Sequence, residues 1–248
     1  MSSTKLRVVL ATSAIVLTMT SAAPAASAAR ALHWKGHDWR VRTWAGAPAV
    51  NGAWSDRNVQ VDSKGRLHLR VARSTAGALT SAEIESVREG WGYGTYRFVV
   101  ASRVDTLPKN VVLGLFTYDS RPADGNREID VEASAWGSDG PTVWDHTYFH
   151  TRDGVKTAVG VGHTKAPADG RSTHEVTWQP GRITWKTWRS DGTLLRTSTT
   201  TADVPRPGRE KVLLNLWVFG GAGWQATPST EVDIESFAFR PRAVTITR

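Results

Sequence analysis

Residues 174–188 read HEVTWQPGRITWKTW, and this stretch carries the strongest fold signal in the chain. Polar and apolar residues alternate on both sides of Gln179-Pro180-Gly181, which has the composition of a tight turn. Side chains at every second position of a strand share one face, so each half can bury one face and expose the other. The stretch therefore predicts a β-hairpin.

The same period of two recurs along the chain in short segments rich in β-branched and aromatic residues. These segments are RLHLRVA (66–72), GTYRFVVAS (94–102), NVVLGLFTY (110–118), EIDVEAS (128–134), KVLLNLWVF (211–219) and EVDIESFAF (231–239). Turn clusters such as DSKG, RPADGN, TRDG and RPGR separate them. No amphipathic helix, linker or repeat interrupts the pattern. The sequence predicts a single all-β domain of two packed antiparallel sheets.

The N-terminus has the order of a secretory signal peptide. Lys5 and Arg7 precede the apolar run VVLATSAIVLTM, and small residues follow up to Ala26-Ser27-Ala28. The apolar run is too short, and too interrupted by Thr and Ser, to span a membrane. We expect a leader over 1–28 and a secreted, extracellular, monomeric protein whose one catalytic domain covers 29–248, with no membrane partner.

Composition excludes several other classes of protein. The chain has no Cys, so the fold uses no disulfide. Its formal net charge of +8 falls to +6 without Lys5 and Arg7, and the remaining charges form no basic run. We therefore expect no nucleic-acid partner, because such proteins carry a clustered basic patch or a known motif. The seven His residues show no metal-ligand spacing and no G-x-S-x-G motif is present, so neither a catalytic metal nor a serine nucleophile is predicted.

Within EIDVE, the acidic residues Glu128, Asp130 and Glu132 stand at every second position and share one face of a strand, while Ile129 and Val131 face the core. A solvated strand face is the simplest interpretation, but three like charges in a row repel one another. Glycoside cleavage needs such carboxyl groups, one ionised and one protonated. Positions i and i+4 lie roughly 13 Å apart on a straight strand, whereas a retaining pair needs about 5–5.5 Å. Side chains that lean inward on a curved strand would narrow the gap.

In their order and spacing, NVVLGLFTY, EIDVE, HEVTWQPGRITWKTW and LLNLWVFGGAGW resemble the family 16 glycoside hydrolases, in particular the bacterial lichenase-like endo-β-1,3-1,4-glucanases. The resemblance runs from about Trp54 to Pro241. It implies a jelly-roll β-sandwich of the concanavalin-like lectin/glucanase type, with a polysaccharide cleft on the concave sheet and hydrolysis with retention. In the family motif E-x-D-x-E, Glu128 would be the nucleophile, Asp130 its assistant and Glu132 the general acid/base. No cofactor would be required.

The resemblance also indicates which residues contact the sugar. It places Asn215 and Trp217 in the cleft, and the alternation in LFTY puts two aromatic residues on the strand before the catalytic one. Trp224, after GGAG, would form a platform at the cleft edge, and Glu83 matches a residue that binds sugar hydroxyls. The predicted substrate-binding residues are Tyr118, Trp217, Asn215, Phe116, Trp224 and Glu83.

A second triplet, Glu231, Asp233 and Glu235, lies in EVDIES near the C-terminus. It follows LLNLW, where family members have their last strand, packed away from the cleft. The resemblance therefore implies a structural role, with Asp233 near a position that binds a structural calcium ion. A free surface carboxylate is the alternative.

Several residues depart from the lichenase pattern, so the sequence does not identify the polysaccharide substrate. Asn126-Arg127 precedes the motif where lichenases have Trp-Asp, and Glu85 stands where a sugar-binding Arg is expected. The best supported substrate is a β-1,3-1,4-glucan. The alternatives are a β-1,3-glucan, a xyloglucan, a galactan, or a lectin-like binding protein without catalysis.

Overall fold

The computed structural model describes residues 29–121 and 123–243. The predicted leader, residues 1–28, lies outside the described residues. Within them the chain forms β-strands and three 3₁₀ turns, η1 (Asp56–Asn58), η2 (Asp124–Arg127) and η3 (Trp224–Ala226), but no α-helix. A search of the described residues for a helix with the length and apolar character of a membrane span finds none.

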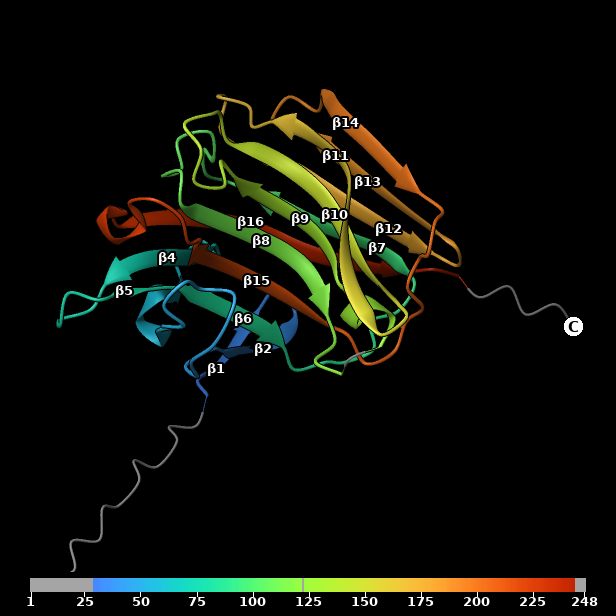
Figure 1. The fold of residues 1–248 in the computed structure, drawn as a ribbon, viewed down its shortest axis with the longest axis horizontal. Helices are drawn as coiled ribbons and strands as arrows, with labels where there is room; N and C mark the ends of the chain where they lie inside the picture. The colour runs from blue at the N-terminus through green and yellow to red at the C-terminus, as the bar shows by residue number, and fades with distance from the viewer. Residues whose placement is uncertain (1–28, 122, 244–248) are drawn as a thin grey trace, which may run out of the picture.

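Two antiparallel sheets form the molecule and pack face to face (Figure 1). The first sheet runs in the order β1 (Ala31–Trp34), β2 (His37–Val41), β6 (Ala82–Ser86), β15 (Lys211–Val218), β8 (Val111–Tyr118), β9 (Ile129–Ser134), β10 (Val143–Arg152) and β11 (Val155–Lys165). The second runs in the order β14 (Leu194–Thr200), β13 (Arg182–Trp188), β12 (Ser172–Gln179), β7 (Gly94–Val100), β16 (Thr230–Pro241), β4 (Leu67–Arg73) and β3 (Val59–Val61), with β5 (Leu79–Thr80) paired to β4. The predicted all-β sandwich is confirmed.

The predicted hairpin is present as β12 and β13, which pair from Gln179 opposite Arg182 outward. Its turn holds Gly181 at a φ of 65°, a left-handed conformation that glycine adopts without strain. Trp178 and Trp185 from its two strands are fully buried between the sheets. The alternation that predicted the hairpin thus marks which side chains enter the core.

Strand β15 shows how alternation divides core from cleft. Val212, Leu214 and Leu216 belong to the buried cluster between the sheets. Asn215 and Trp217, the intervening residues, line the outer, concave face of the first sheet. One strand therefore contributes to the stability of the sandwich through one face and to the cleft through the other.

Strands β10 and β11 were not among the predicted strands. Trp144, His146 and Tyr148 of β10 are buried, but polar residues between and around them hide the pattern. Strand β11 is the outermost strand of its sheet and is exposed along most of its length, so burial imposes no alternation on it. A sequence pattern that reports burial cannot reveal such a strand.

Two fully buried histidines connect strands inside the sandwich. His146 on β10 lies 2.9 Å from Ser198 Oγ and 3.0 Å from Thr187 Oγ1, in the opposite sheet. His174 lies 3.1 Å from the same Thr187 hydroxyl. Burial, with a smaller contribution from the Arg196 charge, lowers the pKa of His146 to about 4. Burial also lowers the pKa of His174 well below its ordinary value.

We expect His146 to make the fold acid-sensitive. Well above pH 6.5, neither the folded nor the unfolded chain holds a proton on this ring. As the pH falls from 6.5 towards about 4, the unfolded chain takes up a proton that the folded chain does not, so the free energy of unfolding falls. A shift of this size corresponds to about 3 kcal/mol.

The measurement is the urea midpoint at pH 7 and at pH 4.5 for the wild type and for His146→Gln, which keeps a neutral hydrogen-bonding side chain. The midpoint of the variant should fall less on acidification. Equal falls in both proteins would contradict the assignment.

Candidate active site

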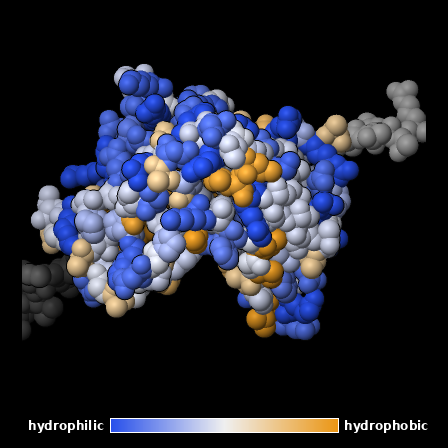
Figure 2. Space-filling view, turned by 90° about the horizontal axis from the view of Figure 1, so that it is seen from above, coloured by the Kyte–Doolittle hydropathy of each residue, from blue (hydrophilic) through white to orange (hydrophobic). Residues whose placement is uncertain are grey.

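A cleft of about 880 Å³ runs across the concave face of the first sheet. The space-filling view shows the outline of the molecule deeply notched on this side (Figure 2). Residues of seven strands and of the Trp44–Pro48 loop line the cleft, among them all three acids of EIDVE. A cleft of this size lies within the range of ligand-binding sites.

Cross-strand pairing sets the order of side chains on the cleft floor. Glu83 pairs with Asn215, Asn215 with Gly114, Gly114 with Glu132, and Glu132 with Asp145. These five residues form one row across the sheet. Gly114 must lack a side chain, because a Cβ there would lie 2.5 Å from Asn215 Oδ1. The row therefore places the Asn215 amide beside the acid Glu132.

The turn that precedes β9 fixes where Glu128 emerges. The four consecutive residues 124–127 have φ values of 47°, 65°, 59° and 51°, all in the left-handed region. A Cβ on Gly125 would lie 2.1 Å from the Phe149 carbonyl oxygen, so only glycine fits against β10 here. The tight turn ends at Glu128, which is the first residue with extended backbone.

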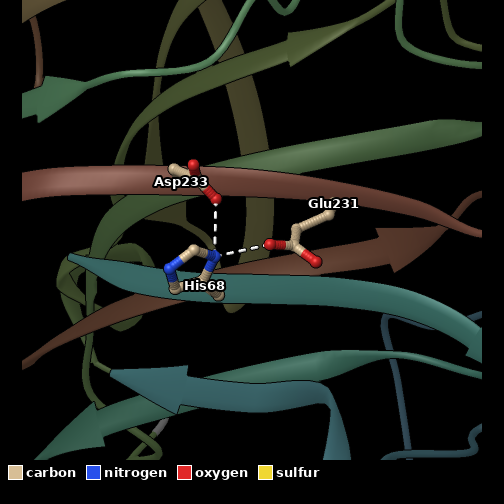
Figure 3. Close-up of side chains that lie close together, drawn as sticks. All are labelled: His68, Glu231 and Asp233. Atoms are coloured by element: carbon tan, nitrogen blue, oxygen red, sulfur yellow. Dashed lines mark hydrogen bonds and ion pairs between the residues drawn. The ribbon is translucent and has the colours of Figure 1, made fainter. Parts of the chain in front are cut away.

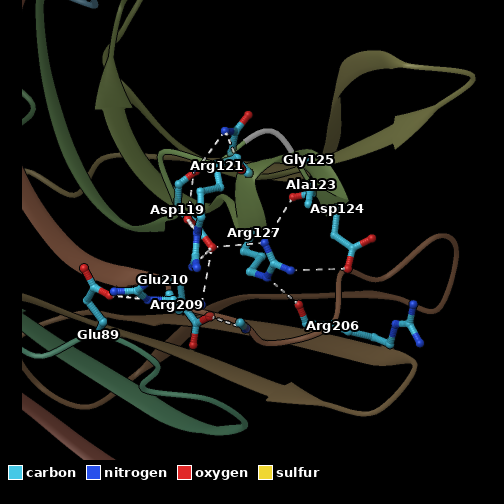
Figure 4. Close-up of polar contacts among 12 residues, drawn as sticks. Glu89, Asp119, Arg121, Ala123, Asp124, Gly125, Arg127, Arg206, Arg209 and Glu210 are labelled. Atoms are coloured by element: carbon cyan, nitrogen blue, oxygen red, sulfur yellow. Dashed lines mark hydrogen bonds and ion pairs between the residues drawn. The ribbon is translucent and has the colours of Figure 1, made fainter.

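Asp119 holds this turn in place from the end of β8 (Figure 4). Arg121 and Arg127 both donate to its carboxylate, and Asn126 Nδ2 donates to its carbonyl oxygen. Burial opposes ionisation, but the hydrogen bonds from Arg121 and from the Arg209 backbone hold the pKa of Asp119 at about 2. Arg127 is thus committed to Asp119, on the side away from the cleft acids, and leaves Glu128 to another partner.

That partner is Lys156, from the start of β11. Its ammonium forms an ion pair with Glu128 Oε2 and lies over the rings of Phe149 and Tyr118, 4.4 and 5.2 Å from their centres. Burial raises the pKa of Glu128, and the hydrogen bond and charge of Lys156 oppose that rise. Glu128 is therefore the acid of the triplet with a cation in direct contact.

Asp130 occupies the middle of the triplet and is buried. Burial, followed by the charges of Glu128 and Glu132, raises the pKa of Asp130 well above its ordinary value. Its Oδ2 is buried without a hydrogen-bond partner. A protonated Asp130 can donate a hydrogen bond to a neighbouring carboxylate, which is the arrangement that like-charged neighbours favour.

Glu132 differs from Glu128 in its surroundings. Burial, then the charge of Glu128 and that of Asp145, raise the pKa of Glu132 to about 8. Asp145 stands directly opposite on β10, where Trp136 Nε1 donates to its Oδ2 at 2.8 Å. Glu132 therefore holds a proton at neutral pH, which is the state a general acid needs.

Of the six predicted substrate-binding residues, five line the cleft: Tyr118, Trp217, Asn215, Phe116 and Glu83. Glu83 is not a solvated acid, because it accepts from Arg42 Nη1 and from Asn215 Nδ2, each at 3.0 Å. Asn215 Oδ1 is left buried and without a partner. Hydrogen bonds thus already orient the Glu83 and Asn215 side chains on the cleft floor.

Trp224, the sixth, lies outside the cleft lining. Its side chain packs against the core cluster between the sheets and does not line the cleft. Gly223, at a φ of 78°, precedes η3, and Arg73 Nη2 donates to the Gln225 carbonyl oxygen. This hydrogen bond attaches η3 to β4 of the other sheet. Trp44 and Trp136 line the cleft instead, and neither was predicted.

Sequence spacing also missed the charged residues around the triplet. Arg42, Asp145 and Lys156 come from three different strands or strand ends, 13 to 86 residues away from EIDVE. Only the two tryptophans carried a signal, since an unusual number of Trp residues (12 in all) indicates that some face a ligand.

The second triplet lies on β16 in the other sheet, away from the cleft. His68 Nδ1 lies 2.5 Å from Glu231 Oε1 and 2.8 Å from Asp233 Oδ1 (Figure 3). Arg70 also contacts Glu231, and Arg171 donates to both oxygens of Glu235. Each acid of this triplet therefore has a basic partner on the sandwich surface.

These residues fit the calcium ion implied near Asp233 poorly. Ca²⁺ takes six to eight oxygen ligands, whereas this cluster offers two carboxylates and an imidazole nitrogen. Burial lowers the pKa of His68, but hydrogen bonds to Glu231 and Asp62 outweigh it and raise the pKa overall. The raised pKa favours the imidazolium form of His68, whose positive charge lies between the two carboxylates, where a metal ion would otherwise bind.

We therefore expect the melting temperature of the wild type to be the same in EDTA and in millimolar CaCl₂, because a ligand that does not bind the native state cannot stabilise it. His68→Ala is the matched variant, because it removes the imidazole and leaves the carboxylates of Glu231 and Asp233 in place. If these carboxylates bind Ca²⁺ once the imidazole is gone, the melting temperature of this variant should rise in CaCl₂. A calcium-dependent rise in the melting temperature of the wild type would overturn this expectation.

Comparisons with known proteins agree with this fold. The family model described as Glycosyl hydrolases family 16 matches residues 47–240. No curated protein sequence matches the chain. Among solved structures, a Bacillus licheniformis beta-glucanase is 24% identical, with 82% of this chain and 92% of that chain covered and a TM-score of 0.62.

Two further solved structures show how widely the fold is used. The kappa-carrageenase of Pseudoalteromonas carrageenovora, in complex with a kappa-carrageenan oligosaccharide, is 15% identical, with 90% and 98% of the chains covered and a TM-score of 0.55. A Mycobacterium tuberculosis protein described as an immunostimulatory antigen and pseudo beta-1,3-glucanase is 20% identical, with 83% and 91% covered and a TM-score of 0.58.

Proposed function

The chain belongs to glycosyl hydrolase family 16, and we propose that it is a secreted, endo-acting β-glycanase that cleaves internal β-glycosidic bonds of a polysaccharide with retention. One observation carries the proposal. Within a single row of acids in a cleft, Glu128 contacts the Lys156 ammonium, whereas burial and the charges of Glu128 and Asp145 raise the pKa of Glu132 to about 8. Retaining hydrolysis needs this asymmetry.

The two steps of the reaction follow from these positions. Glu132, protonated, donates its proton to the leaving glycosidic oxygen while the Glu128 carboxylate attacks the anomeric carbon and forms a glycosyl-enzyme ester. Glu132, now ionised, takes a proton from water, whose oxygen attacks the same carbon and releases Glu128. Asp130, between the two, can donate a hydrogen bond to whichever neighbour carries the charge.

Endo action is supported by the extent of the cleft. Lining residues run from Arg40 and Trp44 on one side of the triplet to Phe149 and Lys156 on the other. Sugar units can therefore lie on both sides of the scissile bond. Aromatic rings suit the apolar C–H faces of sugars, and Trp136 and Trp217 provide them near Glu132.

The three acids of E-x-D-x-E stand at every second position with no inserted residue, as in the lichenase-like members of the family. This spacing favours a β-1,3-1,4-glucan as the substrate. The test is the release of reducing ends from barley β-glucan, laminarin, xyloglucan, agarose and carrageenan. We expect the highest rate on barley β-glucan. A higher rate on another polymer would show that this polymer is the substrate and would leave the proposed reaction unchanged. No release of reducing ends from any of the five polymers would refute the proposed hydrolase.

A binding protein without catalysis is the second candidate, because a pseudo beta-1,3-glucanase is among the similar structures. Affinity electrophoresis in gels that contain each polysaccharide separates the two. Retardation by a polymer that is never cleaved, even at high enzyme concentration, would favour the lectin-like function. The intact triplet and its asymmetric environment support the hydrolase.

A further inference from the structure

Two charged side chains outside the E-x-D-x-E motif flank the acids at opposite ends. Lys156 contacts Glu128 at one end, and Asp145 stands opposite Glu132 at the other. The motif itself is nearly symmetric, Glu-x-Asp-x-Glu, and does not by its composition determine which glutamate ionises first. The surrounding charges, in contrast, are of opposite sign.

We propose that Lys156 and Asp145 are positioning residues that assign the two roles within the triplet, Lys156 by holding Glu128 as the anion and Asp145 by favouring the protonated form of Glu132. This inference rests on the proposed function. It adds two residues to the site and gives the reason that the nucleophile is the first glutamate and the acid/base the second.

The position of Lys156 follows from the β10–β11 hairpin. Its turn, Asp153-Gly154, has φ values of 52° and 77°, as the tight turns of two-residue hairpins require. Lys156 lies two residues after Gly154 and pairs with Thr151. From there its ammonium lies over the Phe149 ring and contacts Glu128. The two aromatic faces stabilise an ammonium at this point, since a cation is attracted to the face of an aromatic ring.

Asp145 is held at its own end of the row. Trp136, itself in a left-handed conformation with a φ of 51°, donates its indole N–H to Asp145 Oδ2. Cβ atoms of directly paired residues lie about 4.5–5.5 Å apart on an antiparallel sheet, so the Asp145 charge acts on Glu132 at short range. Trp136 thus adopts an unfavourable backbone conformation at the point where its indole holds the Asp145 carboxylate opposite Glu132.

The other charged groups that face the cleft largely neutralise one another. These are Arg40 and Lys211, both paired with Glu85, and Arg42, paired with Glu83. Strand β11 adds only His163 beside Asp145, and β8 adds only the phenol of Tyr118. Of the described residues, Lys156 and Asp145 are therefore the charges outside the triplet that act most directly on its two ends.

The pH profile of kcat/KM tests the two residues separately. Its acid limb reports the group that must be ionised, and its basic limb the group that must be protonated. Lys156→Met keeps the apolar stem and removes the charge, so the acid limb should move up by roughly one unit. Asp145→Asn keeps an acceptor for Trp136, so the basic limb should move down by roughly one unit. The double variant should narrow the profile from both sides.

Three controls accompany these variants. Lys156→Arg and Asp145→Glu retain the charges and should restore the wild-type limbs, which a purely steric role would not predict. Lys186→Met removes the same charge from an exposed position on β13, in the other sheet, and should leave both limbs in place. Limbs that do not move in Lys156→Met and Asp145→Asn, in enzymes that remain active and retaining, would overturn the inference while leaving the proposed function intact.

A second measurement does not depend on activity. ¹³C NMR of the glutamate carboxyl groups, assigned through Glu128→Gln and Glu132→Gln, gives the order in which they titrate. We expect Glu128 to ionise at a lower pH than Glu132 in the wild type, and the gap between their pKa values to close in the Lys156→Met/Asp145→Asn protein. If no polysaccharide is cleaved but the gap closes, the proposed function fails and the charge assignment stands. An unchanged gap refutes the assignment.

Discussion

Replacing Glu128 with Gln is expected to abolish polysaccharide hydrolysis. The amide is the same size as the carboxyl group but cannot attack the anomeric carbon, so no glycosyl-enzyme ester forms. A loss of kcat on the order of 10⁴-fold or more is typical when a covalent catalyst is removed. The fold should survive, because Glu128 stands at the cleft surface and its ion pair with Lys156 is partly exposed.

The second acidic triplet supplies matched controls. Glu231→Gln and Glu235→Gln make the same chemical change on β16, where the side chains contact His68, Arg70 and Arg171 on the other sheet. Both variants should keep near wild-type kcat and KM. Activity and melting temperature are measured on all three proteins. If Glu231→Gln lost as much activity as Glu128→Gln at equal thermal stability, the assignment of the two triplets would be reversed.

The fold was predictable where strands bury one face. Along β15, Val212, Leu214 and Leu216 enter the core and give the strand its period, and the β12–β13 hairpin buries Trp178 and Trp185 in the same way. Burial is the physical cause of the alternation, so the pattern and the core carry the same information. Strand β11 buries little on either face, and its sequence contains no such period.

The acids of the site were predictable for a related reason. Glu128, Asp130 and Glu132 lie on one strand, so their common face follows from local spacing alone. Lys156 and Asp145 reach the same acids only through strand pairing across β9, β10 and β11. No local spacing encodes that pairing. The charges that distinguish Glu128 from Glu132 therefore depend on strand pairing in the sheet, whereas the two glutamates themselves can be recognised in the motif.

Trp224 shows the converse. Its position after a glycine-rich segment suggested a mobile edge of the cleft, because glycines permit many backbone conformations. In the structure, Gly223 uses that freedom for one left-handed turn that directs η3 towards β4, and Trp224 packs against the core. Glycines in a sequence indicate that a segment can adopt several conformations, but they do not indicate the part of the molecule against which the segment packs. Tertiary contacts, here Arg73 with Gln225, decide it.

Alanine variants of the two glutamates should fail in different ways, which tests the roles within the triplet. Glu132→Ala should lose about 10²–10⁴-fold in kcat on polysaccharide, the usual contribution of a general acid/base. On an aryl glycoside whose leaving group needs no protonation, Glu128 should still form the glycosyl-enzyme. Azide, which needs no general base, should then enter the space left by Glu132 and release a β-glycosyl azide with restored turnover.

In Glu128→Ala, azide has to act in place of the missing nucleophile, from the same side of the sugar. Attack on the substrate itself then inverts the anomeric centre once and gives an α-glycosyl azide. Proton NMR of the two products distinguishes the configurations, and His163→Ala, outside the triplet, is a control in which azide should have no effect on turnover. An α-product from Glu132→Ala together with a β-product from Glu128→Ala would show that the roles are exchanged. The charges make that exchange improbable on physical grounds, because an ammonium beside the general acid and a carboxylate beside the nucleophile would oppose both steps of the reaction.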